Sequence, residues 1–233
     1  MRTTGATRAD FGKLAVAQRE NALRFPSALM KKPLTLQEYL DARPISDPIH
    51  LFDCVMPCAG AEAFLVMRED VARDLKLPFA RILGTIERHN AFPDDAMQSR
   101  GGWVVDIDEL YGMAGVRPEA IDFVETYDDY PVISMMQLED LGLCGRGEVA
   151  EFVRTHSFTV DGSCPHNTSG GQLSVGQAGC AGGFLGLVEA VRQLTGQTLG
   201  GQVRDAEIGL VSGFGMITYD RGLASCAALL GKA

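Results

Sequence analysis

The sequence predicts an α/β protein in which helices pack in layers on a sheet. Helix-like segments, with apolar residues three or four apart, alternate along the chain with short apolar runs typical of strands. The 233 residues are 46% hydrophobic and 22% charged, which suffices for one large domain or two small ones. No apolar run reaches the roughly 18 residues of a membrane-spanning helix, so we expect no membrane span.

The first part of the chain predicts helices before strands. An amphipathic helix is expected over 7–25, where residues suited to capping precede the apolar pattern and a proline follows it. Thr35 and Glu38 have the spacing of a second capping box and predict a short helix. A buried strand over 61–67 and a helix over 68–75 are expected next.

The middle of the chain predicts a strand over 79–88 and another over 121–126. Between them we expect a polar loop over 90–103 and a helix over 105–114. The helix predicted over 132–141 is apolar on nearly every side and is therefore expected to be buried.

The last part of the chain begins with a glycine-rich segment over 161–183 that leads into a helix over 184–194. Two apolar segments follow, over 208–211 and 223–230, with GFGMITYDRG between them. They predict a hairpin of two core strands.

Charge and cysteine usage exclude several classes of protein. The chain has 21 Lys and Arg against 30 Asp and Glu, and we see no basic patch, so nucleic acid is not an expected partner. The six cysteines lie in apolar or glycine-rich stretches, which favours a reduced, cytoplasmic protein. His50, Cys54 and Cys58 are four apart, but Pro57 prevents the helix that would align them, so no metal site is expected.

The segment from Glu125 to Tyr130 is the first candidate site. It combines three acids with two phenols at the end of a predicted strand, where α/β proteins usually place their sites. The alternative is a solvated loop in which Asp128 or Asp129 caps the next helix, and the residue pattern alone favours this alternative.

Two glycine-rich segments are further candidates. The loop over 167–183 lets the backbone approach a ligand and leads into a helix N-terminus, which suits a pyrophosphate, carboxylate or thioester oxygen, although tight helix packing is the alternative. No lysine follows its glycines and no strand runs into a dinucleotide fingerprint, so nucleotide hydrolysis is disfavoured. The segment 212–216 has backbone amides for an oxyanion, but a β-turn has the same residues and is the preferred interpretation.

Taken together, three long segments resemble the thiolase superfamily, specifically the C-terminal half of its sterol-carrier or lipid-transfer type. They are PLTLQEYLDARPISDPIHLFDCVMPCAGAEAFLV, ETYDDYPVISMMQLEDLGLCGRGEVAEFV and NTSGGQLSVGQAGCAGGFLGLVEAVRQLTGQ, in the family's order over nearly the whole chain. The resemblance implies a layered α/β/α thiolase-like fold. Residues 1–103 would supply linking helices and the first strands of the C-terminal domain, and 104–233 its remainder.

The resemblance also implies an acyl-CoA thioester as substrate, no separate cofactor, and a reaction in lipid metabolism that makes or breaks a carbon–carbon bond next to the thioester. Tyr127 falls where the family's histidine is usual, and Gln177 falls on the histidine of its glycine-rich loop. The family's nucleophilic cysteine belongs to the half that this chain lacks, and its terminal cysteine motif falls near Ser212 without a cysteine.

Relatives with tyrosines at such positions cleave steroid side chains by a retro-aldol reaction, together with a small OB-fold partner. The resemblance therefore implies either acyl transfer or retro-aldol cleavage, and a catalytically inactive subunit that binds a CoA ester or a partner is the alternative. By this reasoning the expected catalytic residues are Tyr127, Asp128 and Gln177, with Glu125 and Tyr130 as candidates by position. The expected substrate-binding residues are Asn167, Ser169, Gly170, Gly171, Gly176, Ser212 and Gly213.

The segment Met1 to Gly5 aligns with an internal stretch of longer relatives. The chain is therefore expected to be either a half-subunit or a sequence that starts at an internal methionine. A lone half would expose the face that the other half covers. We expect an obligate oligomeric assembly with an N-terminal-half subunit, an OB-fold partner or both.

Overall fold

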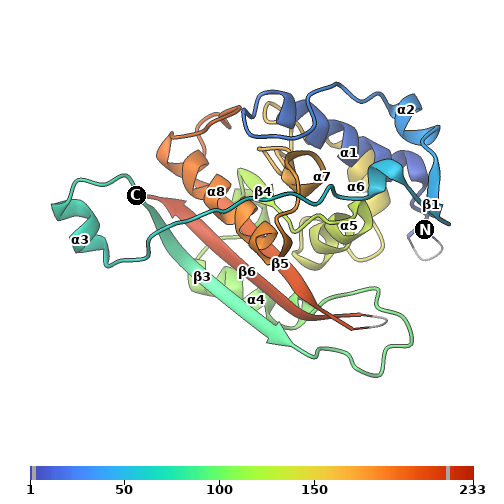
Figure 1. Cartoon of the computed structure of the whole chain (residues 1–233). Coiled ribbons are helices and arrows are strands. Elements are labelled where there is room, and N and C mark those ends of the chain that lie inside the picture. The colour runs from blue at the N-terminus through green and yellow to red at the C-terminus, as the bar shows by residue number, and fades with distance from the viewer. Residues whose placement is uncertain (2–3, 219–220) are drawn as a thin grey trace.

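The computed structural model describes residues 1, 4–218 and 221–233, shown in Figure 1. Its sheet has four strands in the order β3 (Ala80–His89), β6 (Gly222–Lys232), β5 (Ile208–Ile217) and β4 (Phe123–Glu125). The first three are antiparallel neighbours, whereas β4 runs parallel to β5. A mixed sheet of this kind requires helical connections to bring β4 beside β5.

Helices cover both faces of the sheet. Because side chains alternate along a strand, neighbouring residues of β6 enter different cores: Leu229 packs with the cluster that includes α4 (Trp103–Ala114), and Leu230 packs with the cluster of α8 (Leu185–Thr195). Figure 1 shows α8 in front of the sheet and α4 behind it. The predicted layered α/β/α fold is confirmed.

The N-terminal helix is positioned by its cap. α1 (Arg8–Leu23) begins at Thr7, whose backbone N–H and hydroxyl both donate to a carboxylate oxygen of Asp10, at 2.7 and 2.9 Å. The helix packs against four other helices, so its polar side chains are brought into the interior. The second predicted capping box, at Thr35, begins α2 (Leu36–Leu40).

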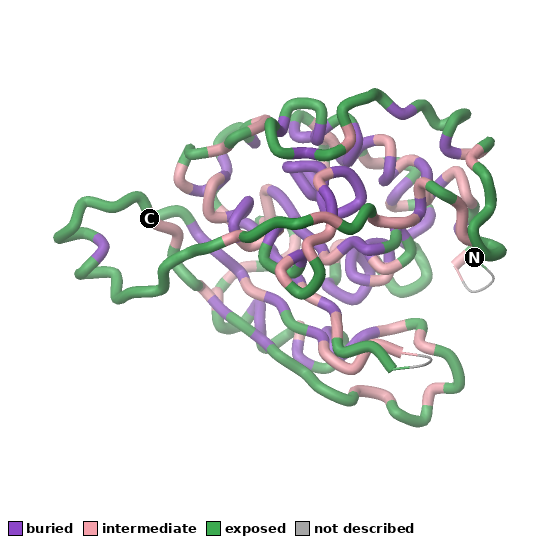
Figure 2. The backbone as a smooth tube through the Cα atoms, viewed as in Figure 1, coloured by how far each residue is buried: buried purple, intermediate pink, exposed green. Residues whose placement is uncertain are grey.

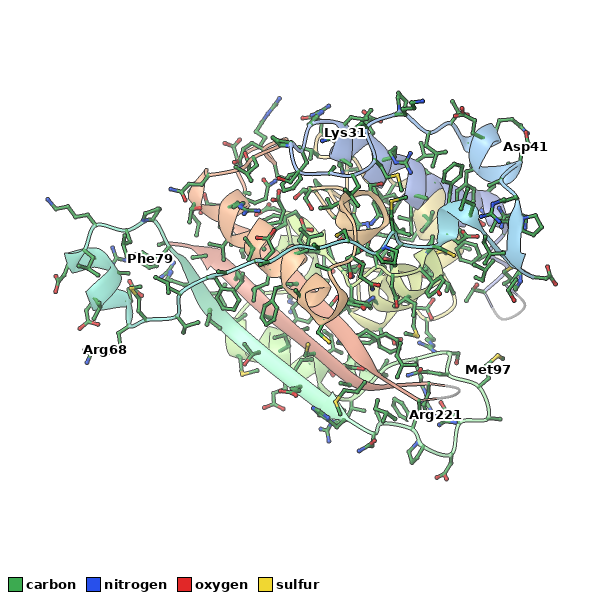
Figure 3. The ribbon with its side chains drawn as sticks, viewed as in Figure 1. Lys31, Asp41, Arg68, Phe79, Met97 and Arg221 are labelled. Atoms are coloured by element: carbon green, nitrogen blue, oxygen red, sulfur yellow. The ribbon has the colours of Figure 1, made fainter. Side chains whose placement is uncertain are left out.

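The remaining elements are short and connect the layers. They are β1 (Pro44–Ser46), β2 (Ile49–His50), η1 (Leu51–Asp53), α3 (Glu69–Asp74), η2 (Pro118–Ala120), α5 (Pro131–Asp140), α6 (Val149–Thr155), α7 (Gly171–Val175) and η3 (Gly179–Phe184). α3, which lies between the labelled Arg68 and Phe79 in Figure 3, projects from the body of the molecule. α6 and α7 were not predicted, and α5 is largely buried as expected.

The buried strand predicted over 61–67 is wrong. The segment is extended but exposed, with Leu65 82% and Val66 71% accessible to solvent. Figure 2 shows it as an exposed strap across the face of α8. Its apolar residues indicated a strand, but a strand also needs a hydrogen-bonded neighbour, and the described part of the chain places none beside it.

The β-turn preferred over 212–216 is also wrong, because these residues continue β5. Pairing with β6 extends to Ile217 opposite Gly222, so the hairpin is longer than predicted. Phe214 anchors this part of the strand against the ring of Trp103, with 5.8 Å between ring centroids. Residues 219 and 220 of the predicted connection lie outside the described residues.

Within the described ranges, no helix is long and apolar enough to cross a bilayer. The six cysteines are not joined by disulfides.

Candidate active site

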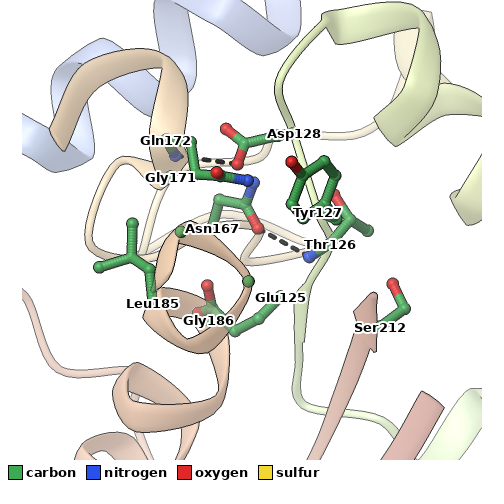
Figure 4. Close-up of a pocket in the computed structure, with 12 residues that line it drawn as sticks. Glu125, Thr126, Tyr127, Asp128, Asn167, Gly171, Gln172, Leu185, Gly186 and Ser212 are labelled. Carbon is green, nitrogen blue, oxygen red and sulfur yellow. Dashed lines mark hydrogen bonds between the residues drawn. The ribbon is translucent and has the colours of Figure 1, made fainter. Parts of the chain in front are cut away.

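A small cavity lies where two parallel strands separate. β4 ends at Glu125, opposite Val211, while β5 continues beside β6. The chain after β4 diverges, and the gap is closed by the glycine-rich loop and the start of α8, as Figure 4 shows. The cavity measures about 10 Å³, room for roughly one water molecule. Its lining consists of Glu125, Thr126, Tyr127, Asp128, Asn167, Gly171, Gln172, Gly182, Gly183, Leu185, Gly186 and Ser212.

The structure brings together two residues that the sequence places 50 positions apart. The side-chain amide of Gln177 donates to the phenolic oxygen of Tyr127 at 3.1 Å. Burial, followed by the nearby charge of Asp129, raises the pKa of Tyr127 above its ordinary value. The phenol therefore keeps its proton near neutral pH and can donate a hydrogen bond into the cavity.

Gln177 is held by the segment 56–58, which precedes the strap. Its backbone N–H donates to the carbonyl of Met56 at 2.9 Å, and its carbonyl accepts from the N–H of Cys58 at 3.0 Å. This short parallel bridge fixes the main chain of Gln177 on both sides. The adjoining Gly176 has φ +119, and a Cβ there would lie 2.8 Å from the Cys58 sulfur, so glycine is required.

Asp128 is buried and anchors the glycine-rich loop. One carboxylate oxygen accepts from the N–H of Gln172 at 2.8 Å, and the other accepts from the N–H of Leu173 at 3.2 Å and the amide of Gln18 at 2.7 Å. Burial raises the pKa of Asp128 to about 7 in spite of these donors. Both oxygens are thus occupied in holding α7, and direct proton transfer by Asp128 stays a prediction.

Asn167 and Gln172 supply polar groups to the cavity wall. The side-chain oxygen of Asn167 accepts from the N–H of Thr126 at 2.8 Å. Among the described residues, the amide nitrogen of Asn167 and the amide oxygen of Gln172 are buried without a hydrogen-bond partner. An unpaired donor and an unpaired acceptor in one cavity suit a water molecule, while a carbonyl oxygen would pair with the donor, Asn167, alone.

Sequence reasoning missed the buried His166, which supports the site from behind. Its Nε2 lies 2.8 Å from the hydroxyl of Thr126, which in turn donates to Ser134 at 3.0 Å. Burial lowers the pKa of His166 to about 3, so the ring is neutral. Its position beside Asn167 was the one signal in the sequence, and no local pattern distinguishes it from any other histidine.

Two buried acids share one hydroxyl next to the cavity. The Thr168 hydroxyl lies 2.7 Å from a carboxyl oxygen of Glu125 and 3.0 Å from one of Glu189. A hydroxyl has one hydrogen and cannot donate to both, so one carboxyl must carry a proton. Burial and mutual repulsion raise the pKa of Glu125 well above its ordinary value.

The predicted site residues divide into two groups. Those that line the cavity are Glu125, Tyr127, Asp128, Asn167, Gly171 and Ser212. The others lie outside the lining: Gln177 donates to Tyr127, and two glycines are close-packed, since a Cβ on Gly170 would lie 2.4 Å from that of Ala22 on α1 and one on Gly213 would lie 2.7 Å from the Cys226 sulfur. Ser169 is fully buried, while Tyr130 is 37% exposed at the start of α5. Substrate contact by Ser169, Gly170, Gly176 and Gly213 stays a prediction.

The layered α/β/α domain, with its cavity at the end of β4 and its glycine-rich loop, has the arrangement that the thiolase resemblance implies. The chain belongs to the family described as thiolase C-terminal domain-like, whose model matches residues 102–225, more than half of the chain. The resemblance seen in the sequence is thereby confirmed.

Individual relatives agree with this family. The chain is 35% identical over 208 residues to the steroid side-chain-cleaving aldolase of Thermomonospora curvata, a match that covers 85% of this chain and 52% of the relative. It is 32% identical to the 17-hydroxy-3-oxo-4-pregnene-20-carboxyl-CoA lyase of Mycobacterium tuberculosis, covering 85% and 53%. The solved structure titled "Ltp2-ChsH2(DUF35) aldolase" superposes with a TM-score of 0.84 at 28% identity, covering 100% of this chain and 60% of the other. The chain spans about half the length of the curated relatives it matches.

Proposed function

We propose that this chain is the C-terminal part of a thiolase-like acyl-CoA enzyme that cleaves a carbon–carbon bond next to a thioester by a retro-aldol reaction. The observation that carries the proposal is the phenol of Tyr127, protonated at the cavity and fixed by the amide of Gln177. The names of the two curated relatives, an aldolase and an acyl-CoA lyase, support the same reaction class.

A retro-aldol cleavage needs two services from the protein. The proton of the substrate hydroxyl must be carried to the α-carbon of the acyl-CoA product, and the thioester oxygen must be stabilised while the electrons of the breaking carbon–carbon bond form an enolate. The second service fits this cavity, which has room for one oxygen atom. Tyr127 would donate from one side and the unpaired amide of Asn167 from another.

The raised pKa of Tyr127 suits the role of donor. A phenol with a raised pKa keeps its proton near neutral pH, so its O–H remains available to donate a directed hydrogen bond to a developing oxyanion. Gln177 donates to the phenolic oxygen, which leaves the phenol hydrogen free to point at the substrate. In this assignment Asp128 is a positioning group that holds the loop carrying Gln172.

The chain is proposed to act in an assembly with an N-terminal-half thiolase subunit, an OB-fold partner or both, in the reducing cytoplasm that suits its unbridged cysteines. Two observations support a partner. The chain spans about half the length of its curated relatives, and the apolar strap at Leu65 is exposed.

The test is Tyr127→Phe in the assembled protein. Turnover of a β-hydroxyacyl-CoA, followed as acyl-CoA and carbonyl products by mass spectrometry, should fall at least about 100-fold, because the donor to the enolate is lost. Binding of the CoA ester, measured by calorimetry, should change little.

Tyr111→Phe is the matched control. Tyr111 is likewise a phenol held by a hydrogen bond, to the carbonyl of Leu141 at 2.9 Å, but it does not line the cavity. Its loss should cost stability and leave turnover unchanged. Unchanged turnover in Tyr127→Phe would contradict the role of Tyr127. Tight CoA-ester binding with no product from the unmodified assembly would instead support an inactive binding subunit.

A further inference from the structure

Gln137 occupies the gap between the two strands that form the cavity. It lies on α5 and is fully buried. Its side-chain oxygen accepts from the N–H of Tyr127 at 3.2 Å, and its nitrogen donates to the carbonyl of the same residue at 2.6 Å. The side-chain oxygen also accepts from the hydroxyl of Ser212 at 2.7 Å. One amide thus joins the main chain after β4 to a side chain of β5.

The register of the strands explains why such a bridge is needed. Pairing between β4 and β5 ends at Glu125 opposite Val211, and the next residue of β5 is Ser212. The peptide groups of Tyr127 lie beyond this pairing and would be left without partners in the interior, which is costly. The side-chain amide of Gln137 supplies the hydrogen bonds that continued pairing with β5 would have given, and the space between the two chains remains open as the cavity.

We infer that Gln137 is the positioning residue for the reaction assigned to Tyr127: it fixes the phenol-bearing main chain and the facing Ser212 hydroxyl as one rigid unit. The expected effect on turnover rests on the proposed function, whereas the positioning of Tyr127 by Gln137 does not. Figure 4 shows Tyr127 and Ser212 on the two elements that Gln137 connects. Because Gln137 does not itself line the cavity, it would act through these two residues.

The hydrogen-bond inventory explains why the residue is an amide. The oxygen of Gln137 accepts two hydrogens, and its nitrogen donates two, the second to the carbonyl of Ile133 at 3.0 Å. A glutamine offers two acceptor sites and two donor hydrogens on one side chain. Glutamate at this position would keep the acceptors and lose both donors, and methionine would keep the shape and lose all four bonds.

Gln193 provides a matched control. It is a buried glutamine on α8 that also bonds to main chain in both directions, accepting from the N–H of Val203 at 2.8 Å and donating to the carbonyl of Gly201 at 2.8 Å. It bonds to neither Tyr127 nor Ser212. Its nitrogen also donates to the Thr168 hydroxyl at 3.1 Å and to Glu189 at 3.0 Å, so Gln193→Met removes a comparable set of buried hydrogen bonds, none of them to the main chain of Tyr127.

The first readout needs no substrate. The tyrosines are labelled with 3-fluorotyrosine, and the fluorine resonance of Tyr127 is assigned by its absence in Tyr127→Phe. In Gln137→Met we expect this resonance to shift and its phenol to titrate closer to the ordinary range, because the ring is no longer held in place. Gln193→Met should leave both unchanged. A Tyr127 resonance and titration identical to wild type in Gln137→Met would overturn the inference.

The second readout is turnover in the assembled protein. Misplacing a reacting group by about 1 Å can cost about 100-fold in rate, so kcat should fall by roughly 10- to 100-fold in Gln137→Met, with KM changed less than about twofold. Gln137→Glu keeps the acceptor for Ser212 but sets a carboxyl oxygen against the carbonyls of Tyr127 and Ile133, so it should not recover the loss.

The outcomes separate the two proposals. Equal losses of kcat in Gln137→Met and Gln193→Met would mean a general structural effect and would overturn the positioning role. A shifted Tyr127 resonance in an assembly that turns over no acyl-CoA would support the positioning role and count against the proposed function.

Discussion

At the scale of single residues, the region around the cavity is notable for acids held away from water. Glu125 and Asp128 are each almost fully buried, and Thr168 lies between Glu125 and Glu189. A buried acid whose folded-state pKa is raised binds its proton more tightly in the folded state than in the unfolded chain. Folding stability then falls as the pH rises from the ordinary pKa of about 4.3 toward the raised value.

Glu125→Gln tests this dependence. The amide has no proton to lose, so the variant should lose less stability than wild type between about pH 5 and pH 8, by more than about 1 kcal/mol. Urea unfolding at both pH values measures the difference. Because the charge of Glu125 repels Glu189, the effect should exceed that of Glu119→Gln, a change in the exposed turn η2. An unaltered pH slope in Glu125→Gln would show that Glu125 is not the proton-binding group.

At the scale of elements, the glycine-rich loop is shaped by steric fit as much as by flexibility. Gly171 has φ +60, and a Cβ there would lie 2.2 Å from a carboxylate oxygen of Asp128. The same oxygen accepts from Leu173 and Gln18, so it cannot move aside without breaking these bonds. The start of α7 therefore depends on glycine for its contact with Asp128.

Gly171→Ala should destabilise the protein by about 1–3 kcal/mol, because strain at positive φ adds to the clash. Gly112→Ala is the control. Gly112 lies in α4, where a methyl group would meet no neighbouring side chain of the described residues within 4 Å, and alanine should stabilise that helix by about 0.5–1 kcal/mol. Thermal and urea unfolding measure both. Equal stability of Gly171→Ala and wild type would refute the steric requirement.

Elements with local signals could be predicted, and elements with distant partners could not. The caps at Thr7 and Thr35 lie within three residues of their partners, so both helices were recognisable. The strap over 61–67 and the segment 212–216 depend on whether another strand pairs with them, which local residues do not reveal. In the site, Tyr127 and Gln177 were found through the family resemblance, whereas Gln137 and His166 act through contacts that no sequence spacing encodes.

At the scale of the whole molecule, the chain has exposed apolar residues on the strap and spans about half the length of its curated relatives. Leu65 and Val66 on the strap are largely exposed, and the chain matches about half of each curated relative. Contiguous exposed apolar residues usually mark a surface that another protein covers. The proposed N-terminal-half partner would bury this strap.

Leu65→Glu tests the partner surface. A charge on this side chain should leave the thermal stability of the chain unchanged, because Leu65 is already in water, and should weaken association with the partner at least about tenfold. Native mass spectrometry of the co-expressed subunits measures association. Met97→Glu, at a residue 72% exposed on a different loop, should leave association intact. Undiminished assembly by Leu65→Glu would place the interface elsewhere.

The bridge between Gln177 and the segment just before the strap connects this surface to the candidate site. Leu65 follows Cys58 by seven residues on the same extended stretch of chain, and Met56 and Cys58 clasp the main chain of Gln177. A partner that covers the strap would also restrict the main chain of Gln177, whose side-chain amide donates to the phenol of Tyr127. Binding of the partner and the positioning of Tyr127 would thus be coupled through this short stretch of backbone. In the isolated subunit, the side chains of Gln177 and Tyr127 would then be held less firmly.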